Sequence, residues 1–156
     1  MGPTFYEIET IGSGLLAVMA KPVAGEWIDD EFSGLASAGL MQVVSLLEEH
    51  EAYEVGLRDE ASLCEKHGLQ FVSFPIPDRG TPDSLTSFAA TTKKLYRDVA
   101  SGINTVIHCR AGIGRTGLVA AGVLLHAAFE VERHSVAFQM VEVLKYPILM
   151  SKDTGS

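Results

Sequence analysis

A cysteine and an arginine separated by five residues are the side chains of this sequence best placed to do chemistry. Residues 106–117 run from an apolar segment through a glycine-rich loop into a second apolar segment. The loop between Cys109 and Arg115 is long enough to wrap successive backbone N–H groups around one tetrahedral dianion where a helix begins. Gly112 and Gly114 lack the Cβ atoms that would obstruct close approach of the backbone to bound oxygens. The sequence therefore predicts a phosphate-binding loop.

The side chains of this loop predict nucleophilic chemistry. The N–H groups and helix dipole that attract phosphate also stabilise a thiolate, so Cys109 is expected to be the nucleophile. Arg115 carries a planar fork of donors that matches two phosphoryl oxygens. Thr116 is expected to donate its hydroxyl to the cysteine sulfur, both before attack and when the thiolate leaves. The predicted phosphate site is completed by the intervening residues Arg110, Ala111, Gly112, Ile113 and Gly114.

The arrangement His-Cys-x5-Arg-Thr at residues 108–116 resembles the signature of the cysteine-dependent protein tyrosine and dual-specificity phosphatases. The resemblance covers roughly residues 15–145 and is strongest to compact dual-specificity forms, such as the bacterial and kinase-associated types. It implies hydrolysis of phosphotyrosine monoesters through a cysteinyl-phosphate intermediate. Phosphoserine and phosphothreonine are expected to enter too, because no aromatic phosphotyrosine-recognition segment is evident. The low-molecular-weight and rhodanese-like phosphatases also have a Cys-x5-Arg loop, but they fit this chain less well.

Expulsion of an alcohol or phenol oxygen requires a proton, which a positioned carboxylic acid can supply. Asp78 is the preferred acid, because Asp-x-Gly-x-Pro resembles the mobile acid loop of the same phosphatases. Asp83 is the alternative, although its place in the first turn of a predicted helix gives it a structural role with the helix dipole. His108 is the alternative as a general base, but neighbouring side chains on a strand point in opposite directions, so its side chain is expected to point away from that of Cys109. We therefore expect His108 to hold the loop through hydrogen bonds.

Strands and helices alternate along the chain, which predicts an α/β fold with a mainly parallel central sheet of about five strands and helices on both faces. A hairpin is expected over residues 5–19, with later strands at 41–47, 69–74 and 104–108. Helices are expected over 60–67, 85–99 and 117–129, and a last one from Ser135 to Tyr146-Pro147. We expect residues 1–150 to form a single catalytic domain and 151–156 a disordered tail.

Two further features of the sequence are an acidic segment and a second cysteine. The acidic residues between Glu48 and Arg58 are interpreted as a solvated face. Cys64 is expected to be a small buried hydrophobe, with a redox partnership to Cys109 as the alternative.

Composition limits the partners. The formal net charge is −8, which argues against nucleic acid or an anionic membrane, because both need a basic surface. Two cysteines and the absence of a signal-peptide pattern favour the cytoplasm. The histidines lack metal-ligand spacing, so neither metal nor cofactor is expected. We expect a monomer that acts on phosphorylated proteins; the alternatives are a phosphatase of a small phosphometabolite or inositol phosphate, and an inactive phosphate-binding module.

Overall fold

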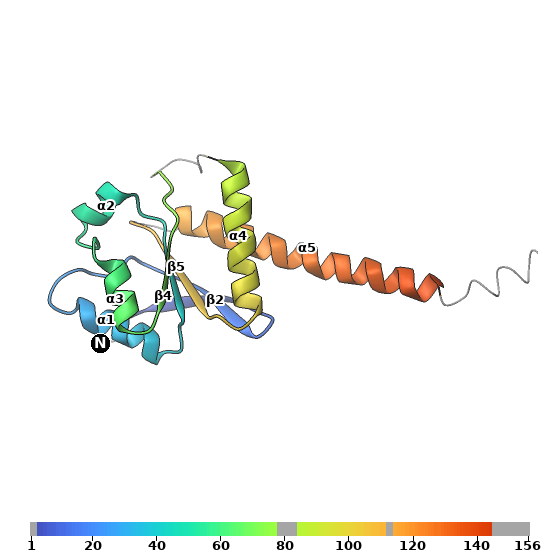
Figure 1. Cartoon of the computed structure of the whole chain (residues 1–156), viewed down its shortest axis with the longest axis horizontal. Coiled ribbons are helices and arrows are strands. Elements are labelled where there is room, and N and C mark those ends of the chain that lie inside the picture. Colours follow the sequence, from blue (N-terminus) through green and yellow to red (C-terminus); the bar gives the residue numbers. More distant parts are fainter. Residues whose placement is uncertain (1–2, 78–83, 112–113, 145–156) are drawn as a thin grey trace, which may run out of the picture.

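The computed structural model describes residues 3–77, 84–111 and 114–144, and strands and helices alternate in these segments (Figure 1). The strands are β1 (Phe5–Ile11), β2 (Gly14–Met19), β3 (Gln42–Ser45), β4 (Gln70–Ser73) and β5 (Thr105–His108). The helices are α1 (Ile28–Ser37), α2 (Glu49–Glu54), α3 (Glu60–Lys66), α4 (Leu85–Ala100) and α5 (Gly114–Leu144).

The strands form one sheet in the order β1-β2-β5-β3-β4. β1 and β2 make the antiparallel hairpin at its edge, whereas β2 with β5, β5 with β3 and β3 with β4 pair in parallel. The predicted α/β architecture with a mainly parallel five-stranded sheet is confirmed. β5 has a neighbour on each side and all four of its residues are buried, so the residue that follows it emerges from the middle of the sheet.

Helices cover both faces of the sheet, as predicted (Figure 1). Because successive strand residues point to opposite faces, β5 contributes to two separate cores. Val106 packs in a buried cluster with Cys64 and other side chains of α1 and α3. Ile107 packs in a second cluster with Val99 of α4 and Val119 of α5. The two cores hold β5, and with it the start of the predicted phosphate-binding loop, from both sides.

Hydrogen bonds continue past the carboxyl ends of the parallel strands. The N–H of Leu46 donates to the carbonyl of His108 at 3.0 Å, and the N–H of Phe74 donates to the carbonyl of Ser45 at 2.9 Å. The N–H of Ile76 then donates to the carbonyl of Leu46 at 3.1 Å. The segments that follow β3, β4 and β5 are therefore held together at one edge of the sheet, where ligands of such folds commonly bind.

The last helix differs from the prediction. Separate helices are expected over 117–129 and from Ser135, but α5 is one continuous helix of 31 residues. The physical reason is that residues 123–144 contain neither glycine nor proline, so no residue interrupts the backbone hydrogen bonds. The second half of α5 projects beyond the sheet (Figure 1), and apolar side chains such as Phe138 are exposed there. Tyr146-Pro147, the predicted end, lies outside the described residues.

Candidate active site

Cys109 is the first residue after β5 and lies at the carboxyl end of the central strand. It is 2% exposed and belongs to the buried cluster that contains Leu46 and Ile76. Its Sγ lies 3.8 Å from the carbonyl oxygen of Ala111. The order strand, loop and helix is as the sequence predicts, although Gly112 and Ile113 lie outside the described residues.

Arg115 lies in the first turn of α5, and its guanidinium is fixed by several acceptors. Nη1 and Nη2 donate to Oε1 and Oε2 of Glu51 at 2.7 and 3.0 Å, which is a bidentate pair. Nη1 also donates to the carbonyl of Ile76 at 2.8 Å and, at 3.5 Å, to that of Leu46. Because Cys109 belongs to the same buried cluster as these two residues, the structure brings the predicted nucleophile and the predicted clamp to one end of the molecule.

Glu51 corrects the interpretation of residues 48–58 as a solvated face. It is 2% exposed, and its carboxylate also accepts a hydrogen bond from the N–H of Glu48 at 3.0 Å. The hydrogen bonds from Arg115 lower the pKa of Glu51 and outweigh burial, which acts in the opposite direction. The one local signal that could have found Glu51 is its spacing from Glu48, because the two residues form a capping box at the start of α2.

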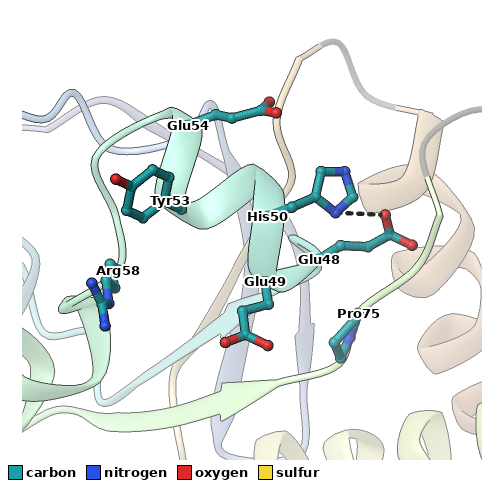
Figure 2. Close-up of a pocket in the computed structure, with 7 residues that line it drawn as sticks. All are labelled: Glu48, Glu49, His50, Tyr53, Glu54, Arg58 and Pro75. Atoms are coloured by element: carbon teal, nitrogen blue, oxygen red, sulfur yellow. Dashed lines mark ion pairs between the residues drawn. The ribbon is translucent and has the colours of Figure 1, made fainter.

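The remainder of α2 forms the wall of an open groove beside the loop. Figure 2 shows its lining residues, with an ion pair between Nδ1 of His50 and Oε2 of Glu48 at 3.4 Å. The groove has a volume of about 830 Å³. At its rim Glu54 forms an ion pair at 2.5 Å with Nη1 of Arg110, the residue after the predicted nucleophile. Two acidic residues of α2, three positions apart, thus hold two arginines of the loop region.

His108 is buried, and each of its ring nitrogens lies near an oxygen atom. Nε2 lies 2.6 Å from Oε2 of Glu60, and Nδ1 lies 3.4 Å from the carbonyl oxygen of Cys109. The side chains of His108 and Glu60 are 0% and 3% exposed. Sequence reasoning missed Glu60, because a glutamate at the first position of a helix is usually explained by the helix dipole alone.

The other predicted residues are less completely defined. Thr116 is 2% exposed, and its hydroxyl has no hydrogen-bond partner among the described residues. The predicted bond to the Cys109 sulfur is therefore not formed in this structure, and the role of Thr116 stays a prediction. Asp78 and its alternative Asp83 lie outside the described residues, although the chain is described up to Pro77, directly after the Ile76 carbonyl that binds Arg115.

Cys64 lies on the other side of the sheet from Cys109. It is fully buried in the cluster of α1 and α3, whereas Cys109 belongs to the cluster of α4 and α5. Burial, with a smaller contribution from the charge of Glu60, raises the pKa of the Cys64 thiol to about 12. Neither cysteine forms a disulfide bond, and this geometry favours the buried-hydrophobe interpretation of Cys64 over a redox pair.

No helix in the described ranges is long and apolar enough to cross a membrane. Within the same ranges, no three His, Cys, Asp or Glu side chains gather in a group that could hold a metal ion.

Comparison with known proteins identifies similar chains. Residues 17–128, which include Cys109 and Arg115, match a family model described as "Polymorphic toxin system, DSP-PTPase phosphatase". Cyclin-dependent kinase inhibitor 3 of Rattus norvegicus is 31% identical over 99 residues, which cover 64% of this chain and 46% of the relative. The chain thus spans about half the length of this curated relative.

Solved structures share the fold. A kinase associated phosphatase whose catalytic-site cysteine is replaced by serine superposes with a TM-score of 0.73 at 23% identity, over 81% of this chain and 75% of that one. The active form of Tk-PTP superposes with a TM-score of 0.58 at 26% identity, over 76% of this chain and 78% of that one. The phosphatase-type architecture expected from the sequence is therefore confirmed.

Proposed function

Because the chain belongs to the polymorphic toxin system DSP-PTPase phosphatase family, we propose that it hydrolyses phosphotyrosine monoesters of proteins, and phosphoserine and phosphothreonine monoesters as well. The observation that carries this proposal is the buried guanidinium of Arg115, fixed by both oxygens of Glu51 at the end of the sheet where Cys109 emerges. A guanidinium held in this way offers a preorganised positive charge to a phosphoryl group.

The proposed reaction has two steps. The Cys109 thiolate attacks phosphorus, an S–P bond forms and the bond from phosphorus to the substrate oxygen breaks, while Asp78 gives its proton to that oxygen. Water then attacks the phosphocysteine, Asp78 accepts a proton from it, and the S–P bond breaks to release inorganic phosphate and the thiolate. Arg115 stabilises the charge on the phosphoryl oxygens in both steps. Thr116 is proposed to stabilise the departing thiolate, and His108 to support the loop.

The test is release of phosphate from an aryl phosphate in the presence of a metal chelator. We expect turnover by the unaltered chain, none by Cys109→Ser, and turnover slowed by about a hundredfold or more by Asp78→Asn. Unchanged turnover in Cys109→Ser would exclude the mechanism. Tight binding of a phosphopeptide by the unaltered chain without release of phosphate would instead indicate a binding module.

The class of substrate can be tested by trapping. The Asp78→Ala variant is expected to capture phosphorylated proteins from a lysate, because it forms the substrate complex but does not protonate the leaving group. The variant could instead retain no phosphoprotein while the unaltered chain rapidly hydrolyses a phosphosugar or inositol phosphate. That outcome would show that the substrate is a small molecule.

We propose that the protein acts in the cytoplasm as a monomer, with phosphorylated proteins rather than nucleic acid or membranes as partners. The net charge of −8 supports the exclusion of polyanionic partners. Sedimentation at micromolar concentration tests the monomeric state, because the exposed apolar side chains of α5 are the surface through which two copies would associate if the protein formed dimers.

Residues 1–150 are proposed to act as one catalytic domain with 151–156 as a tail, which limited proteolysis would test.

A further inference from the structure

We propose that Glu60 is a positioning residue for Cys109 and that it acts through His108. The inference rests on the proposed phosphatase function and assigns to it a residue of α3, outside the phosphate-binding loop. Glu60 and His108 are 48 positions apart in the sequence, but Oε2 of Glu60 lies 2.6 Å from Nε2 of His108. Both side chains are almost completely buried, so water does not compete for this contact.

The two oxygens near the ring hold it in one orientation. A carboxylate and a carbonyl only accept hydrogen bonds, so Nε2 and Nδ1 satisfy Glu60 and the Cys109 carbonyl together only when both nitrogens carry a hydrogen. The contact of Nε2 with Glu60 fixes the direction of the ring, so that Nδ1 stays beside the carbonyl of Cys109. Without Glu60, Nε2 would be buried without this partner, and the ring could turn away from Cys109.

A fixed Cys109 carbonyl also fixes the first donor of the loop. The peptide bond between Cys109 and Arg110 is planar, and the C=O and N–H of a trans peptide point in opposite directions. When the carbonyl of Cys109 accepts from His108, the N–H of Arg110 is turned away from His108, toward the opposite side of the peptide. This N–H belongs to the group of loop amides that the sequence predicts to bind the dianion and to stabilise the thiolate.

Glu60 itself lies apart from the loop. It lines a cavity of about 360 Å³ between α2, α3 and the ends of β3 and β4, whose lining residues include none from 109–111 or 114–116. Its carboxylate is therefore proposed to influence the sulfur of Cys109 indirectly, through His108, and not by direct contact. An effect of Glu60 on Cys109 should consequently disappear when His108 is absent.

The experiment measures alkylation of Cys109 by iodoacetamide at pH 7, followed by peptide mass spectrometry. The reagent is neutral and no substrate is present, so the rate reports the thiol and not anion binding or turnover. We expect Glu60→Gln to slow alkylation about tenfold and to lower kcat for an aryl phosphate by a similar factor, with KM little changed. Glu65→Gln, an exposed substitution on the same helix, should react at the wild-type rate.

A double substitution separates positioning from general loss of structure. In a His108→Gln background, Glu60→Gln should cause no further loss of alkylation rate. A wild-type rate in Glu60→Gln, or effects of the two substitutions that multiply, would overturn the proposal. If circular dichroism shows that Glu60→Gln does not fold, Glu60→Met takes its place because it also removes the carboxylate, and a wild-type rate in Glu60→Met overturns the proposal equally. Since alkylation needs no turnover, absence of phosphatase activity would refute the proposed function and leave this measurement intact.

Discussion

Replacement of Glu51 by glutamine tests whether the buried ion pair with Arg115 holds the site together. The substitution keeps the shape of the side chain but removes the negative charge opposite a guanidinium that is 5% exposed. Loss of one partner from a buried ion pair typically costs 3–5 kcal/mol, because the other charge stays in a medium of low polarity. The Ile76 carbonyl still accepts from Arg115, so we expect the lower end of this range, about 3 kcal/mol. For a chain of this size that corresponds to a fall in Tm of about 6–12 °C.

Urea unfolding at pH 7 measures this loss, and Glu54→Gln is the matched control. Glu54 lies on the same helix and also pairs with an arginine of the loop region, but its side chain is 51% exposed. An exposed pair of this kind is worth less than about 1 kcal/mol. Equal destabilisation by the two substitutions would refute the argument that burial makes the Glu51 contact important.

The same variant has an expected pH dependence. Arg115 holds the pKa of Glu51 below its ordinary value of 4.5. A carboxylate whose pKa is lowered by folding stabilises the folded state above its unfolded pKa, and this contribution is lost as the pH falls through the folded pKa. The difference in stability between the wild type and Glu51→Gln should therefore be complete at pH 7 and shrink below pH 4.5. A difference that stays constant down to the acid limit of folding would contradict this assignment.

Two further substitutions and one chemical modification give distinct outcomes. Gly14→Ala should destabilise the fold by about 2 kcal/mol or more in urea unfolding, because its Cβ would lie 2.0 Å from the carbonyl oxygen of Val99. Gly117 lies inside α5, and a Cβ added there would have no atom within 4 Å. Gly117→Ala should therefore stabilise the folded protein by about 0.5–1 kcal/mol, and a loss of stability would show that the helix is strained there. Cys64, whose pKa burial raises to about 12, should resist iodoacetamide at pH 8 in the folded protein and react after unfolding in urea; rapid labelling of the native state would disprove its burial.

The sequence was sufficient for the elements whose signals are local. The buried strand before Cys109, the glycines of the loop and the apolar start of α5 lie within residues 106–123, and together they predicted the strand, loop and helix that the structure contains. The alternation of strands and helices likewise predicted the parallel sheet. These features depend on periodicity and on short-range geometry, which a single sequence displays.

The residues that sequence reasoning missed depend on contacts between distant parts of the chain. Glu51 and Arg115 are 64 positions apart, and Glu60 and His108 are 48 apart. A buried glutamate that pairs with a distant cation has no local pattern that separates it from the exposed glutamates beside it, so Glu51 was assigned to a solvated face. The continuity of α5 was also missed, because a helix end was expected at Phe129 and the helix runs on to Leu144.

The bidentate contact of Arg115 with Glu51 fixes the orientation of the guanidinium as well as its position. Glu51 receives one hydrogen from each terminal nitrogen, and the Ile76 carbonyl receives another from Nη1, so the plane of the guanidinium cannot rotate freely about the side-chain axis. The adjacent edge of that plane carries the Nε hydrogen parallel to the second Nη2 hydrogen, at the spacing of two oxygens on one tetrahedral centre. The orientation of any oxyanion that meets this edge is thus set by a carboxylate that the anion never touches.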